Sequence, residues 1–118
     1  MAEINPKRIM AGMAEKNRML TQKNEEYVDL VEKRAQAERA YNIAVARETL
    51  NQKAEGQSIT IIDKLVRGDR VIADLKYALD VAEGVQRACL QSIKAITIQI
   101  DSYRSLLAWA KAEMLRSE

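Results

Sequence analysis

The second half of the chain carries an apolar repeat whose steps alternate between three and four residues without a break. It consists of Ile72, Leu75, Leu79, Ala82, Gln86, Cys89, Ile93, Ile96, Ile100, Tyr103, Leu107, Ala110 and Met114. These steps place the residues on one side of an α-helix, and their seven-residue period is that of a coiled-coil seam. We therefore expect a long helix over residues 61–116, with ends uncertain by about 2–4 residues.

The first half of the chain shows a weaker form of the same pattern. Asn5 and Pro6 form a helix start, because Asn caps the helix and Pro fits its first position. Apolar residues then recur at heptad steps and at the three- or four-residue offset: Met13, Leu20, Tyr27 and Tyr41, with Leu30, Ala37 and Val45. Arg34 and Glu48 stand where apolar residues are expected. The pattern predicts a first helix over residues 6–55.

A turn over residues 56–60 separates the two predicted helices. Gly56 suits the position just after a helix end, where the backbone adopts a positive φ. Thr60 and Asp63 form a capping box that would start the second helix, with Ser58 as an alternative cap. Such a short turn favours antiparallel packing of the two helices. It would place Tyr41 opposite Leu75.

The composition agrees with long helices. The chain has 118 residues, no Phe, one Trp and four Tyr, and 31% of its residues are charged. Aromatic side chains supply much of the buried area of globular domains, so a compact core is not expected. The fold class predicted is all-α: a single domain, residues 1–118, in which two long antiparallel helices form a helical hairpin or coiled coil. Two such helices make a thin core, so association into an oligomeric bundle is expected.

The sequence offers no residues for enzymatic chemistry. It contains no His and one Cys, Cys89, and it lacks phosphate-binding and dinucleotide-binding glycine motifs. Glu25, Asp29 and Glu32 share a helical face, but the di-iron bundle pattern also needs His, so a solvated face is the favoured interpretation. We expect no catalytic residue, no cofactor and no metal. Cys89 lies in the seam and is predicted to pack as a small apolar residue.

The segment at the beginning has no apolar region typical of a secretory signal, and charges interrupt every apolar stretch. These features, with the single Cys, predict a cytoplasmic protein that does not enter a membrane.

The favoured function is a non-enzymatic protein–protein interaction module, such as a scaffold, adaptor or inhibitor. Apolar residues beyond the seam are expected only near the termini, and such a surplus needs a second neighbour. The predicted interface comprises Ile96, Ile98, Ile100, Tyr103, Leu106 and Trp109. Its partner would be a second copy of the chain or another protein.

A nucleic-acid-associated accessory factor is an alternative function. Residues 1–23 and 87–118 together carry ten bases and five acids, so the terminal end would be basic. The candidate phosphate contacts are Arg8, Lys16, Arg18, Lys94, Arg104 and Lys111. Because aromatic stacking residues are few, an ordinary mixed-charge surface is favoured over nucleic-acid binding. A virion assembly component is a further alternative.

Two segments carry a resemblance to a known group. Ala54-Glu55-Gly56-Gln57-Ser58-Ile59-Thr60 joins two charged, Ala-rich helices, and Asp101-Ser102-Tyr103-Arg104-Ser105-Leu106-Leu107 lies near the end of the second. In these features the chain resembles small helical-hairpin proteins of bacterial phages and prophages. The resemblance implies a phage-encoded helical protein, and it assigns no functional residue.

Overall fold

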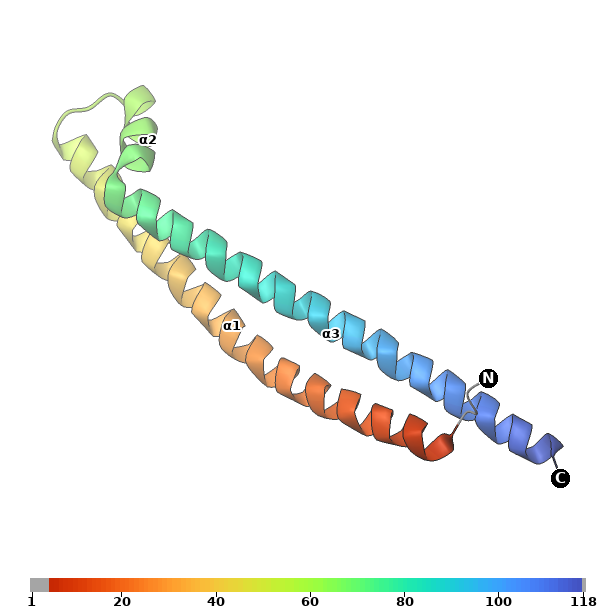
Figure 1. Ribbon diagram of the computed structural model, residues 1–118. Helices are drawn as coiled ribbons and strands as arrows, with labels where there is room; N and C mark the ends of the chain where they lie inside the picture. The colour runs from red at the N-terminus through yellow and green to blue at the C-terminus, as the bar shows by residue number, and fades with distance from the viewer. Residues whose placement is uncertain (1–4, 118) are drawn as a thin grey trace. The chain divides into compact units, whose positions relative to one another are not determined.

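The computed structural model describes residues 5–117, and in this range it contains three helices and no strand. They are α1 (Pro6–Ala54), α2 (Ile59–Gly68) and α3 (Arg70–Arg116), shown in Figure 1. The all-α prediction is confirmed. The chain divides into two compact units: unit 1 comprises Met1–Tyr27 with Ala88–Glu118, and unit 2 comprises Val28–Arg87.

The start of α1 follows the expected cap. The Asn5 side-chain oxygen accepts a hydrogen bond from the Lys7 backbone N–H at 2.9 Å, and the Asn5 carbonyl accepts one from Ile9 at 3.1 Å. Pro6 is the first helical residue, where its missing N–H costs nothing. The cap therefore satisfies donors that have no partner within the helix.

The end of α1 is a Schellman motif built on a glycine. Gly56 has a φ of 80°, its N–H donates to the Lys53 carbonyl at 3.0 Å, and the Gln57 N–H donates to the Gln52 carbonyl at 3.1 Å. These two bonds satisfy carbonyls that the helix leaves open. Gly56 therefore occupies the position that the sequence predicts.

Replacing Gly56 with Ala is expected to lower the free energy of unfolding by about 1 kcal/mol, because a Cβ strains the positive φ. Gly68→Ala is the matched control: Gly68 is helical, and nothing lies within 4 Å of an added Cβ there. This second variant should be as stable as the original chain or slightly more stable. Urea titrations followed by circular dichroism measure both, and equal destabilisation of the two variants would contradict the role of Gly56.

The predicted second helix is not continuous, and this part of the prediction is wrong. Asp69 adopts an extended backbone with φ −63° and ψ 130°, which ends α2 at Gly68. The Asp69 side-chain oxygen accepts the Ile72 N–H at 3.1 Å, so Asp69 caps the first turn of α3. Asp favours such a cap over a helix interior because its short side chain competes for backbone donors.

The predicted capping box at Thr60 is also wrong. α2 begins at Ile59 and the preceding residue, Ser58, occupies the cap position without a side-chain cap bond. The Ser58 hydroxyl lies 3.1 Å from the Thr60 hydroxyl, while Asp63 pairs with Arg67 one turn later at 3.2 Å. The Ser58 alternative gives the right position, because the turn after Gly56 is shorter than predicted.

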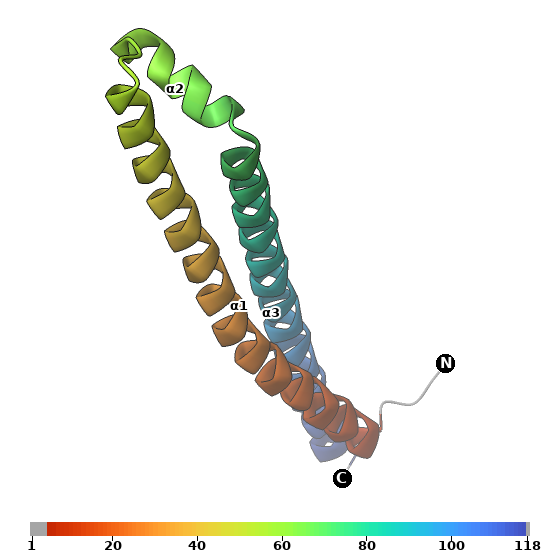
Figure 2. The ribbon, with the colours of Figure 1, turned by 90° about the vertical axis from the view of Figure 1, so that its left-hand side faces the viewer.

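Unit 2 is held together by a small hydrophobic cluster. Ile62 and Val66 of α2 and Ile72 of α3 are buried, with Tyr41, Ala44 and Val45 of α1 packed against them. Ile62 and Val66 lie four residues apart, so they share the inner side of α2. Figure 2 shows α2 running across from the end of α1 to the start of α3. The cluster thus fixes a ten-residue helix that is too short to be stable alone.

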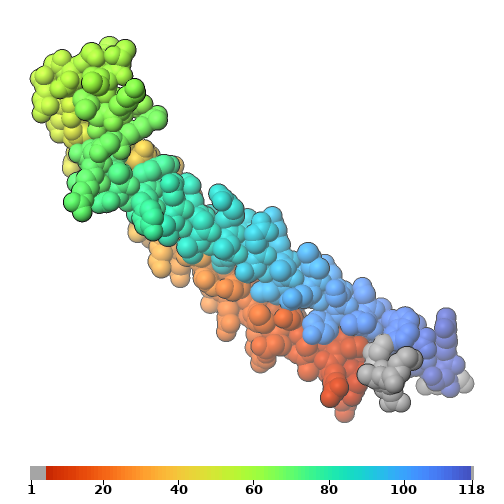
Figure 3. Space-filling view, turned by 45° about the horizontal axis from the view of Figure 1, so that its top comes forward, coloured from red at the N-terminus to blue at the C-terminus, as the bar shows by residue number. Residues whose placement is uncertain are grey.

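Unit 1 packs the first part of α1 against the last part of α3. Its buried residues are Ile9, Cys89, Ile96, Ile100 and Ala110. A Cβ added at Gly12 would lie 2.6 Å from the Tyr103 ring, so the glycine leaves the space that the ring occupies. In Figure 3 the orange atoms of α1 and the light-blue atoms of α3 lie against each other in this unit.

The seam predicted for α3 matches the pattern of burial closely. Ile72, Leu79, Cys89, Ile96, Ile100 and Ala110 are buried, and the other seam residues except Met114 are half-buried. Met114 is 59% exposed, near the end of α3. A side chain near a helix end has fewer neighbours to cover it.

Candidate protein interaction surface

Between Lys76 and Lys111, the charged residues of α3 are confined to one side of the helix. If Ile72 is assigned heptad position a and Leu75 position d, every charged residue from Lys76 to Lys111 falls at position b or e. They are Lys76, Asp80, Glu83, Arg87, Lys94, Asp101, Arg104 and Lys111. Positions a and d form the seam toward α1. Positions c, f and g therefore form a second, uncharged side of the helix over about ten turns.

We call this second side the charge-free face. It comprises Tyr77, Ala78, Val81, Gly84, Val85, Ala88, Gln91, Ser92, Ala95, Ile98, Gln99, Ser102, Ser105, Leu106, Trp109 and Ala112. All are exposed except Ser92, which is half-buried. The large residues are well exposed, with Ile98 at 66% and Trp109 at 53%. A helix side that meets only water normally carries charges, so this face has the character of a contact surface.

The two long helices differ in this respect. The charged residues of α1 occupy all seven heptad positions, including Arg34 and Glu48 in its seam. On α3 five of the seven positions are uncharged between Lys76 and Lys111. The uncharged side of α3 is therefore the candidate contact surface.

The expectation that exposed apolar residues gather only near the termini is wrong. Unit 2 exposes Val28, Ile43, Leu50, Ile59, Ile61, Leu65, Val71, Tyr77, Val81 and Val85. Ile43 and Val71 line an open groove in this unit, together with apolar and charged residues: Ala40, Ala44, Ile72, Arg47, Glu48 and Asp69. The sequence pattern predicted an exposed apolar surface only near Trp109. The feature that identifies the longer surface is the confinement of charge to two heptad positions of α3.

The six predicted interface residues fall into three groups. Ile96 and Ile100 are buried within unit 1, so they hold the chain together. Tyr103 is half-buried beside Gly12. Ile98, Leu106 and Trp109 are exposed and belong to the charge-free face. Leu106 also lines an open groove of unit 1 with Lys16, Gln99, Ser102 and Tyr103.

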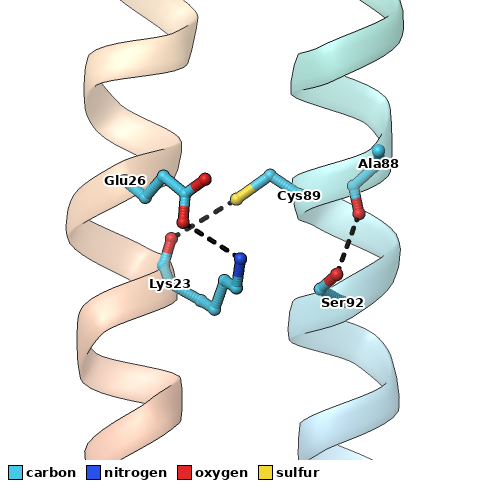
Figure 4. Close-up of polar contacts among 5 residues, drawn as sticks. All are labelled: Lys23, Glu26, Ala88, Cys89 and Ser92. Atoms are coloured by element: carbon cyan, nitrogen blue, oxygen red, sulfur yellow. Dashed lines mark hydrogen bonds and ion pairs between the residues drawn. The ribbon is translucent and has the colours of Figure 1, made fainter.

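Cys89 is buried and points toward α1. Its Sγ lies 3.5 Å from the Lys23 carbonyl oxygen, beside the Lys23–Glu26 ion pair of 3.0 Å (Figure 4). Only 4% of the residue is exposed. The predicted role as a small packed residue is confirmed, and in this position the thiol is shielded from solvent.

The polar interruptions of the two predicted seams meet in unit 2. Arg34 Nε donates to Gln86 Oε1 at 2.8 Å, and Arg34 also pairs with Glu38 at 2.7 Å. A polar layer in an otherwise apolar seam costs stability but favours one register over others. The half-buried Arg34 therefore helps to fix which turn of α1 faces which turn of α3 in this unit.

In unit 2, Lys76 contacts the Tyr41 ring and pairs with Asp80. Its Nζ lies 5.6 Å from the centre of the Tyr41 ring and 3.2 Å from Asp80 Oδ1. The hydrogen bond to Asp80 is the main cause that raises the pKa of Lys76 above its usual value. Lys76 therefore stays charged throughout the neutral range.

The six candidate phosphate contacts all lie in unit 1. Arg18 pairs with Glu15, and Arg104 pairs with Asp101 at 3.3 Å. Lys94, Arg104 and Lys111 lie on the charged side of α3, away from the charge-free face. Acid partners offset two of the six charges, which weakens the basic surface that phosphate binding would need.

Within residues 5–117, no group of three or more His, Cys, Asp or Glu side chains is placed to bind a metal ion. In that range, no helix combines the length and apolarity needed to cross a membrane.

Comparisons with family models, with curated protein sequences and with solved structures found no match to this chain.

Proposed function

We propose that this chain is a non-enzymatic protein–protein interaction module: a helical hairpin of coiled-coil type that self-associates through the charge-free face of α3. The observation that carries this proposal is the combination of exposed Ile98, Leu106 and Trp109 with the absence of charge on that face. Association would remove these apolar side chains from water, and the face of α3 itself contributes no charge to the contact. Lys16 of α1 lines the groove beside Leu106, so its ammonium group would have to stay in water at the edge of the contact.

The hairpin part of the proposal rests on contacts within each unit. In unit 1, Gly12 faces Tyr103 and Lys23 contacts Cys89. In unit 2, Arg34 contacts Gln86 and Tyr41 contacts Lys76. In both units the position on α3 falls as the position on α1 rises, which is the order that antiparallel helices give. Two antiparallel helices pack through one seam on each helix, and their outer sides remain available for partners.

The proposal is tested by measuring the mass of the purified chain with light scattering after gel filtration. We expect a dimer or larger assembly at micromolar concentration, with high helicity by circular dichroism. A well-folded monomer at tens of micromolar would contradict self-association.

Trp109→Ala is expected to weaken association by about 2 kcal/mol while leaving helicity unchanged, because exposed Trp side chains are frequent anchors of interfaces. Leu115→Ala is the matched control: Leu115 is 74% exposed six residues later but lies at heptad position b, outside the charge-free face. Sedimentation of both variants over a concentration series measures the effect. An unchanged dissociation constant for Trp109→Ala would remove Trp109 from the interface.

A further inference from the structure

We infer that the occupant of the charge-free face is the same face of a second copy, with the two α3 helices antiparallel and centred between Ser92 and Ala95. This inference rests on the proposed self-association and adds its direction and register. α3 is one unbroken helix from Arg70 to Arg116, so the argument uses positions along this helix only.

Positions g and c of the face form a seam of their own. The residues are Ala78, Val81, Val85, Ala88, Ser92, Ala95, Gln99, Ser102, Leu106 and Trp109, again at alternating steps of three and four. This is the spacing that packs one helix against another with a small crossing angle. The face therefore has the pattern needed for a helical partner.

The register of the two α3 helices follows from the positions of the charged residues at the two ends of this seam. Asp74 and Glu113 end the uncharged seam on either side, and both occupy seam positions. A full antiparallel overlap keeps both out of the apolar layers, but it places Asp74 opposite Glu113 of the second copy in the layer at each end, where solvent and salt screen the repulsion between the two carboxylates. A shift of one heptad in one direction would place Glu113 opposite Val81 of the second copy, and a shift in the other would place Asp74 opposite Leu106. Both shifts bring a carboxylate against an apolar side chain.

In the full overlap, each large residue meets a smaller one. The layers pair Trp109 with Ala78 of the second copy, Leu106 with Val81, Ser102 with Val85, Gln99 with Ala88 and Ala95 with Ser92. Large residues opposite small ones keep the distance between two helices even.

A parallel pairing in register would instead place Trp109 against Trp109 and Ala78 against Ala78. The helices would then be forced apart at one end and left unfilled at the other. Antiparallel helices also have opposed dipoles. Both considerations favour the antiparallel direction.

The available area suits a dimer. From Tyr77 to Ala112 the face is about 54 Å long at 1.5 Å per residue. A strip about 10 Å wide on each copy then gives about 1,100 Å² of buried surface, just above the roughly 1,000 Å² expected of a specific interface. The partner surface must lack charge over the same length, and the charge-free face of a second copy meets this condition.

Disulfide trapping tests the register. In a Cys89→Ala background, Val85→Cys is made in one chain and Ser102→Cys in another that carries a tag, and both residues are exposed. When the chains are mixed and oxidised, we expect a disulfide between them and none in either chain alone. Two copies of residue 85 would lie about 25 Å apart in the antiparallel pair, whereas a disulfide needs Cα atoms within about 7 Å.

The control pair is Arg87→Cys with Asp101→Cys, which lie at matching heights on the charged side and should not cross-link. Circular dichroism verifies that each variant is folded, and Val81→Cys with Leu106→Cys provides a second pair for the same layer pattern. Disulfides within each chain type alone would show a parallel pairing and overturn the inference. A dimer that forms neither kind of disulfide would overturn the register but not the proposed function, and a monomer would overturn both.

Discussion

Ile100→Asp is expected to unfold unit 1, with a loss of about 4 kcal/mol or more in the free energy of unfolding. Ile100 is 3% exposed and lies in the part of α3 that packs against α1. The change removes a buried apolar side chain and introduces a carboxylate with no partner, and each effect alone costs several kcal/mol. Urea titration monitored by circular dichroism measures the loss.

Ile98→Asp is the control, since it makes the same change two residues away on the charge-free face. Ile98 is 66% exposed, so its carboxylate would stay in water and the helices should persist. We expect this variant to keep its helicity and to associate less, because a charge would enter the proposed interface. Equal loss of helicity in both variants would contradict the assignment of the buried and exposed sides of α3.

Ile72→Ala should destabilise unit 2 by about 2–4 kcal/mol, because it leaves a cavity in a cluster with few other members. Ile72 is buried against Ile62 and Val66, and it is the member of this cluster that belongs to α3. Loss of its side chain should release α2 before the rest of the unit. Hydrogen exchange of the α2 amides, together with a urea titration, measures both effects.

Val71→Ala is the matched control for this substitution. Val71 is the preceding residue and is 64% exposed, so its truncation should change stability by only a few tenths of a kcal/mol. If the α2 amides remain protected in Ile72→Ala, the cluster is not what holds α2 in place.

The parts of the fold that could be predicted from the sequence are those that depend on local rules. The alternation of three and four along α3 requires only that one side of a helix be apolar, and twelve of its thirteen seam residues are buried or half-buried. Asn5 and Gly56 act through hydrogen bonds to residues two to four positions away, and Pro6 acts through its fixed φ and missing N–H. Their effects therefore follow from residue type.

The break at Asp69 depends on a choice between two local structures. A helix through Gly68 and Asp69 would keep the backbone bonds but would use two poor helix formers in succession. The structure instead lets Asp69 cap Ile72 and lets α2 bury Ile62 and Val66. The apolar spacing also indicates this break. Val66 and Ile72 are six residues apart, whereas a heptad pattern repeats after seven.

The charge-free face could not be predicted from large apolar residues, because most of its members are small or uncharged polar residues. Ala88, Ser92 and Ala95 appear neutral when taken singly. These residues indicate a surface only together, because no charged residue occupies the same side of the helix over about ten turns. The exposure of Val81 and Val85 could not be derived from spacing alone, since it depends on which side α1 covers.

The rate at which Cys89 is chemically modified reports how often unit 1 opens. Because the only thiol is buried between α1 and α3 in unit 1, a water-soluble alkylating reagent can reach it only when those helices separate. Where reclosing is faster than labelling, the rate of modification is the rate for a free thiol multiplied by the fraction of open molecules. The native sequence, with no added probe, thus reports the free energy of opening of unit 1 under conditions in which the chain remains folded.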